Sequence, residues 1–175
     1  MPNWCYNELH VGIAADRDVA TIMQQIKDRC AGTTEDGKEI VFDFSSIVPP
    51  PDDPAYRDEP DQATAKKSPN WWHDWNCEHW GTKWNCTHHG KWENEVIRFD
   101  TAWSPPFPIV LELSKMFKDV VFALRYDEPG MGFGGDYICI NGEEAFKDER
   151  SSVPDMDWLI ENALDEHASK EKTPE

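Results

Sequence analysis

A repeated Trp-Asn-Cys-x-His pentapeptide, at residues 75–79 (WNCEH) and 84–88 (WNCTH), carries the side chains best suited to chemistry. Its thiols and imidazoles are Cys77, His79, Cys86 and His88. Thiolate and imidazole are ligands that zinc selects, so these four residues are candidate metal ligands. Their spacing matches no known zinc module, and in a helix Cys77 and His79 would point about 200° apart. We therefore predict no stoichiometric zinc and no other cofactor.

Two catalytic interpretations of the sequence are weaker still. A cysteine could act as a nucleophile with His88 or His89. The chain has no nucleophile elbow, however, and no carboxylate at the sequence spacing of a known catalytic motif. The glycines between 130 and 135 lack the Lys-Ser/Thr ending of a phosphate-binding loop, and no helix start follows them. They are better interpreted as a hairpin connection. The sequence favours a protein that is not an enzyme.

Tryptophan is concentrated between residues 71 and 103, which hold seven of the nine tryptophans. This density predicts a packed centre of the fold, a ligand surface, or both. Each indole buries a large apolar area with few rotatable bonds. We predict that Trp80, Trp84 and Trp103 are buried between the helix that carries Leu113 and the strand that carries Leu9. The tryptophans are not expected to stack on bases, because such platforms normally lie in a basic groove.

The net charge of the chain limits the classes of partner that it is expected to bind. The formal net charge is −17 and the isoelectric point is about 4.6. This field disfavours nucleic acids and anionic membranes, and it suits a protein partner with a basic surface. No apolar run has the length of a membrane span, and no secretion signal is visible at the N-terminus. Together with five scattered cysteines, these features favour a cytoplasmic protein with free thiols.

Residues 49–69 are rich in proline and acid and are predicted to form a surface loop inserted in the domain. With the tryptophans that follow, this loop would give an acidic, aromatic surface for the basic partner. The candidate binding residues are Trp71, Trp72, His79, Lys83, Asp52, Asp53, Asp58 and Glu59.

Hydrophobic periodicity predicts a sequence of strands and helices. The predicted strands are 3–13, 39–48, 84–92, 95–103, 120–127 and 136–140, and the predicted helices lie at 19–30, 70–80, 108–117 and after Ser152. Residues 3–48 and 95–127 each read as a β-α-β unit, the first with parallel strands. The fold class is therefore α+β, a ferredoxin-like sandwich with a mostly antiparallel sheet, helices on one face and an added C-terminal helix. Residues 1–145 form one domain, and residues 146–175 form the C-terminal helix and an acidic tail.

Three motifs carry a resemblance to a known family. MPNWCYN at 1–7, WGTKWN at 80–85 and FDTAWSPP at 99–106 resemble the YubB-type family of phage- and plasmid-encoded proteins. The EPG at 128–130 and the Gly134-Gly135 pair are also similar to that family, whereas His79 stands where the family has Asn. The resemblance implies a ferredoxin-like domain and an origin in a mobile element. It implies no established activity.

Two functions of different class remain open. The first is a non-enzymatic phage or plasmid accessory protein that binds a host or mobile-element protein through its acidic, aromatic surface, for example as an anti-defence inhibitor. The second is a small-molecule-binding or hydrolytic protein with a pocket near the Trp/Cys/His-rich stretch. We favour the first.

Overall fold

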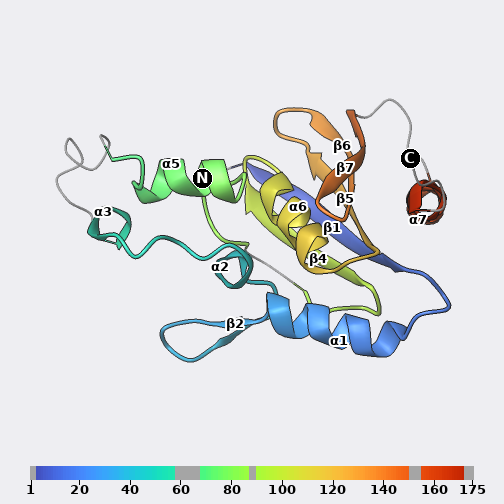
Figure 1. The fold of residues 1–175 in the computed structure, drawn as a ribbon. Helices are drawn as coiled ribbons and strands as arrows, with labels where there is room; N and C mark the ends of the chain where they lie inside the picture. The colour runs from blue at the N-terminus through green and yellow to red at the C-terminus, as the bar shows by residue number, and fades with distance from the viewer. Residues whose placement is uncertain (1–2, 58–67, 87–89, 150–154, 172–175) are drawn as a thin grey trace.

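The computed structural model describes residues 3–57, 68–86, 90–149 and 155–171. A five-stranded sheet of order β4-β1-β5-β6-β7 forms its centre, and all neighbouring strands pair antiparallel (Figure 1). These strands are β1 (Trp4–Ile13), β4 (Val96–Ala102), β5 (Val120–Glu128), β6 (Phe133–Ile140) and β7 (Glu143–Glu149). The predicted fold class is confirmed.

Helices cover both faces of the sheet. The long ones are α1 (Val19–Cys30), α6 (Phe107–Met116) and α7 (Met156–Glu171). Figure 1 shows α6 on one side of the sheet and α7 on the other. Short elements complete the chain: β2 (Gly32–Thr33), β3 (Glu39–Ile40), α2 (Phe44–Ile47), α3 (Pro54–Arg57) and α5 (Trp72–His79).

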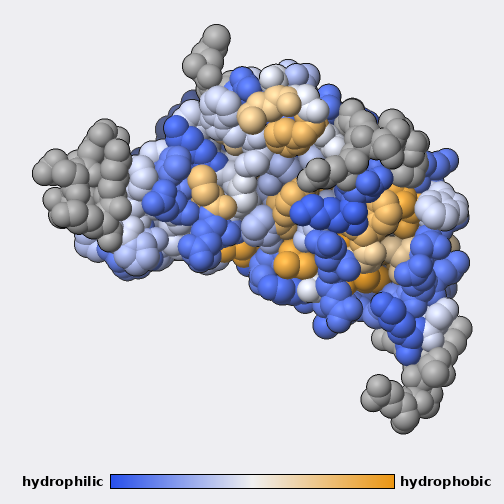
Figure 2. Space-filling model, turned by 90° about the horizontal axis from the view of Figure 1, so that it is seen from above, coloured by the Kyte–Doolittle hydropathy of each residue, from blue (hydrophilic) through white to orange (hydrophobic). Residues whose placement is uncertain are grey.

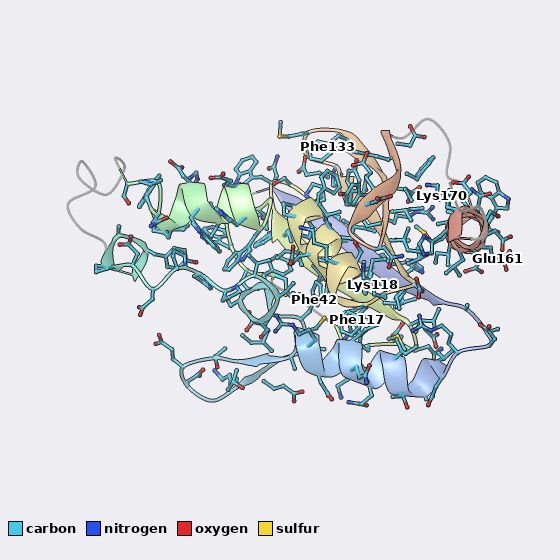
Figure 3. All side chains as sticks on the ribbon, in the orientation of Figure 1. Phe42, Phe117, Lys118, Phe133, Glu161 and Lys170 are labelled. Atoms are coloured by element: carbon cyan, nitrogen blue, oxygen red, sulfur yellow. The ribbon has the colours of Figure 1, made fainter. Side chains whose placement is uncertain are left out.

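Alternation along the strands divides the buried residues into two cores. On β5, Phe122, Leu124 and Tyr126 pack in the larger core with α1 and α6, and Figure 3 shows Phe42 and Phe117 in the layer between these helices. The intervening Val121 and Ala123 pack in a smaller core against α7. The α7 residues in that core are Met156, Leu159 and Ala163. The C-terminal helix thus covers part of the sheet face that the other helices leave open.

The second predicted β-α-β unit is confirmed in a split form. Strands β4 and β5 are both antiparallel to β1, which lies between them, so they run parallel to each other around α6. The first unit is wrong, because residues 39–48 form the short β3 and the α2 turn instead of a strand. Asp43 accepts a hydrogen bond from the Ser45 amide and starts that turn. The alternation of Ile40, Phe42 and Phe44 therefore reflected burial alone.

Three further expectations need correction. Residues 84–86 and 90–92 do not form a strand. The strand predicted to be the last is followed by another strand, β7, which crosses the predicted boundary after residue 145. Trp80 is buried as predicted, but Trp84 and Trp103 are 36% and 44% exposed. Trp103 directly follows the end of β4 and has a φ of 72°. The Ser152 helix start lies outside the described residues.

On the face of the molecule seen from above, the described residues form no continuous apolar surface (Figure 2). Figure 2 shows hydrophobic residues in separate patches bordered by hydrophilic ones. No helix in the described part of the chain combines the length and the apolar character needed to cross a bilayer.

Candidate functional site

The Cys-x-His pairs occupy different environments. Cys77 is exposed, whereas the His79 ring stacks on Trp75 at 4.3 Å between centroids and donates through Nδ1 to the Trp75 carbonyl oxygen. Cys86 is buried and donates its thiol to the Phe42 carbonyl oxygen, and burial raises the pKa of that thiol far above its usual value. His88 lies outside the described residues. Within the described ranges, no group of three or more His, Cys, Asp or Glu side chains is placed to hold a metal ion.

Part of the predicted aromatic surface is assembled. The Lys83 ammonium lies 4.5 Å from the ring centroid of Trp84 and 5.8 Å from that of Trp72, and Trp71 lies edge-on to Trp72 at 5.9 Å. Cation–π contacts of this kind stabilise exposed rings by about 0.5–1 kcal/mol. His79 is held apart from this cluster on Trp75. Trp71, Trp72 and Lys83 therefore share one surface, and His79 belongs to the packing of α5.

The predicted loop acids do not form one described cluster. Asp52 is exposed, while Asp53 accepts hydrogen bonds from the Ala55 amide and from Asn70 Nδ2. The bond from Asn70, with that from Ala55, lowers the pKa of Asp53. Asp53 therefore ties α3 to the segment that precedes α5. Asp58 and Glu59 lie outside the described residues.

A further hollow lies elsewhere, on the part of the sheet face that α7 leaves uncovered. We name this surface the open strip, and its side chains are Tyr6, Glu8, Arg98, Asp100, Arg125 and Asp127. They line a hollow of about 490 Å³. Alternation directs them away from the larger core, because their strand neighbours, such as Leu9, Phe99 and Tyr126, are buried in that core.

Strand register builds the open strip in two rows. Tyr6 lies opposite Asp100 on β4 and Asp127 on β5, so an aromatic ring stands between two carboxylates. Tyr6 is 52% exposed. In the next row Glu8 lies opposite Arg98 and Arg125. Cross-strand neighbours of this kind have Cβ atoms about 4.5–5.5 Å apart, so each row acts as one surface.

Both arginines of the open strip are held by carboxylates. Arg98 Nε donates to Glu8 Oε2 at 2.5 Å, and Arg125 donates through Nε and Nη2 to the two oxygens of Asp136 at 2.7 and 3.1 Å. Burial of Glu8 acts to raise its pKa, but hydrogen bonds from His10 and Arg98 outweigh that effect and leave the pKa below its usual value. These pairs fix the row and give it little net charge.

A second hollow of about 230 Å³ adjoins the first and shares Tyr6 with it. Its lining residues are Asn3, Trp4, Tyr6, Glu128, Pro129 and Gly130. The described residues that line the two hollows include no Ser, Thr, Cys or His side chain. The lining supplies carboxylates, guanidinium groups and aromatic rings, which suit recognition by charge and aromatic contact.

Polar residues at alternate positions of two strands could have indicated the open strip from the sequence. Tyr6 and Glu8 occupy alternate positions of β1, so their side chains lie on the same face of the strand, and the same is true of Arg98 and Asp100 on β4. Polar residues at alternate positions indicate a sheet face on which no other element packs. The pairing of these strands with each other and with β5 was not readable from the sequence.

The comparisons with known proteins concern the family and the fold. The family model described as the ferredoxin-like domain in Api92-like protein matches residues 79–168, just over half of the chain. The chain belongs to this family. A crystal structure of the protein Api92 from Yersinia pseudotuberculosis is similar at 14% identity and a TM-score of 0.47, covering 89% of this chain and 100% of that one. No curated protein sequence matches the chain.

Proposed function

We propose that this member of the Api92-like family is a non-enzymatic binding protein whose open strip receives a basic segment of a protein partner. The observation that carries the proposal is the row in which Tyr6 lies between Asp100 and Asp127. An aromatic face attracts a cation, and carboxylates beside it add charge-assisted hydrogen bonds. A lysine or arginine side chain has the chemistry that fits this row.

The charge of the whole molecule supports the same partner. A net charge of −17 steers positively charged proteins toward the surface and repels nucleic acid and anionic lipid. The arginines of the open strip do not oppose this, because Arg98 is paired with Glu8 and Arg125 with Asp136. The site therefore favours a basic partner over an acidic one.

The biological setting belongs to the same proposal. The motifs at 1–7, 80–85 and 99–106 support a phage- or plasmid-encoded accessory protein of the YubB type that acts in the cytoplasm. Its partner would be a protein of the host or of the mobile element, and inhibition of a host defence is one such role. The half-buried Trp71–Trp72–Lys83 cluster would be a secondary contact surface.

A small zwitterionic molecule is the second candidate occupant of the open strip. The 490 Å³ hollow lies within the range of about 300–1,000 Å³ that is usual for small-molecule sites, and its lining carries both signs of charge. Unlike a basic protein, such a ligand would depend on Arg98 and Arg125 as strongly as on the carboxylates.

Capture from a host lysate with four forms of the protein tests the proposal. These are the parent, the strip variant Asp100→Asn/Asp127→Asn, the arginine variant Arg98→Gln/Arg125→Gln, and the matched control Glu161→Gln/Asp165→Asn on exposed α7 positions. We expect the parent and the control to enrich the same basic protein, and the strip variant to lose it. Recovery should fall as salt rises. Equal recovery by parent and strip variant contradicts the proposal, and a small molecule lost in the arginine variant supports the second candidate.

A further inference from the structure

Glu128, the last residue of β5, is fully buried and only half satisfied. Its Oε2 accepts a hydrogen bond from the Met131 amide, and Oε1 has no hydrogen-bond partner among the described residues. A buried carboxylate oxygen without a partner is unfavourable, and native structures rarely keep one without a reason.

Glu128 belongs to the 230 Å³ hollow beside the open strip. A Cβ atom on Gly130 would lie 2.8 Å from Glu128 Oε1 and 2.7 Å from Asn3 Nδ2. The absent side chain thus lets the carboxylate oxygen and the Asn3 amide border the same space. Trp4 and Tyr6 provide aromatic walls to the hollow.

We propose that this hollow is a subsite for one primary ammonium group, the head of a lysine side chain, which donates a hydrogen bond to Glu128 Oε1. The inference rests on the proposed function, since Tyr6 lines both hollows and a basic segment on the open strip can extend a side chain past it. The lysine stem packs on the rings of Trp4 and Tyr6 while its charged end meets the carboxylate.

The available oxygen selects ammonium over guanidinium. Arginine binds carboxylates best through two parallel hydrogen bonds to both oxygens. Glu128 Oε2 already accepts from the Met131 amide, so only Oε1 remains for a ligand. A compact ammonium group needs only one carboxylate oxygen, because its other N–H groups can donate to water or to an amide oxygen.

The Asn3 side-chain amide borders the same space as this oxygen. In the unbound protein Oε1 is shielded from solvent, and among the described residues Asn3 bonds through its backbone oxygen, which accepts from the Trp103 amide, and not through its side-chain amide. A rotation of that amide therefore breaks no such bond, and it can turn its oxygen toward the ligand as a second acceptor.

The test uses N-acetyl-lysine methylamide as the probe and N-acetyl-norleucine methylamide as its uncharged control, with amide NMR shifts as the readout. In the parent, the lysine probe should shift the Asn3 side-chain and Gly130 amide signals saturably, and the norleucine probe should not. Glu128→Gln and Gly130→Ala should each weaken lysine-probe binding about tenfold or more, as expected for a lost charge-assisted hydrogen bond. Glu143→Gln, an exposed position on β7, should not change it.

No saturable shift in the parent, or equal affinity in Gly130→Ala, overturns the subsite, and so does equal binding of the two probes. Gly130→Ala keeps every charge, so it decides the outcome even if Glu128→Gln does not fold. A captured protein partner that ignores Gly130→Ala but requires Asp100 and Asp127 overturns the subsite and leaves the proposed function standing. Probe binding without any such partner supports the subsite and contradicts the proposed function.

Discussion

Asn85 Nδ2 donates a hydrogen bond of 2.6 Å to Asp43 Oδ1, across 42 residues of sequence. The same Asn85 side chain accepts a hydrogen bond from the Phe44 amide at 2.9 Å. Asn85 ends the WGTKWN motif, and Asp43 and Phe44 begin α2. This asparagine therefore clamps the tryptophan-rich segment to α2 and to the aromatic core beneath it.

Replacing Asn85 with alanine should lower the free energy of unfolding by about 1–3 kcal/mol, because the Phe44 amide and the Asp43 carboxylate each lose a partner. Urea denaturation measures the change. The matched control is Gln25→Ala on the exposed side of α1, which should stay within about 0.5 kcal/mol of the parent. Equal midpoints for the two variants would show that the clamp does not contribute to stability.

The tryptophans of the motifs should differ sharply in their contribution to stability. Trp80 is 3% exposed, donates through Nε1 to the Val48 carbonyl oxygen and packs edge-on against Phe44 and Trp75. Trp80→Ala should cost about 3–5 kcal/mol of unfolding free energy. Trp103, 44% exposed, should cost less than about 1.5 kcal/mol when changed to alanine. A larger loss for Trp103→Ala, in the same denaturation assay, would contradict its observed position.

Gly12 should be required for the docking of α7. A Cβ atom at this position would lie 2.1 Å from Ile160 Cγ2, so Gly12→Ala overpacks the junction of β1 and α7 and should cost about 1–3 kcal/mol. Ile160→Ala removes the obstructing methyl groups. The double variant should therefore be more stable than the sum of the single effects predicts. Strict additivity in a double-mutant cycle would mean that α7 does not pack there.

The hydrogen bonds of Glu8 should make the free energy of unfolding decrease more strongly as the pH falls. The pKa of Glu8 is lower in the folded protein than in the unfolded chain, where it is about 4.3. Its stabilising effect is therefore complete above that value and is lost as the pH falls through the lower folded pKa. The stability difference between the parent and Glu8→Gln should shrink below about pH 4. A difference that stays constant from pH 7 to pH 3 would show that the pairs with His10 and Arg98 do not matter.

The elements whose own residues carry the pattern were predictable from sequence. The alternation in β1 and the apolar stripes of α1, α6 and α7 are local, and the structure contains all four elements. Residues 39–48 misled the prediction because Phe42 and Phe44 are buried from a turn, whose geometry depends on Asn85 far along the chain. The aromatic stretch indicated the core through Trp80 but overstated it for Trp103.

The candidate site was less predictable, for a physical reason. Tyr6, Asp100 and Asp127 come from three strands, and only the register places them in one row. A shift of one residue in any pairing would send a side chain to the other face. The same holds for Asn3 and Glu128, which meet at the end of the sheet although the chain separates them widely.

An NMR titration of the isotope-labelled protein with the partner captured from the lysate shows whether that partner binds the open strip. We expect the largest amide shifts on the open strip, at Tyr6 on β1, Asp100 on β4 and Asp127 on β5, and we expect them to weaken as salt rises. Shifts confined to α7, or to Trp71 and Trp72, would contradict the proposed function.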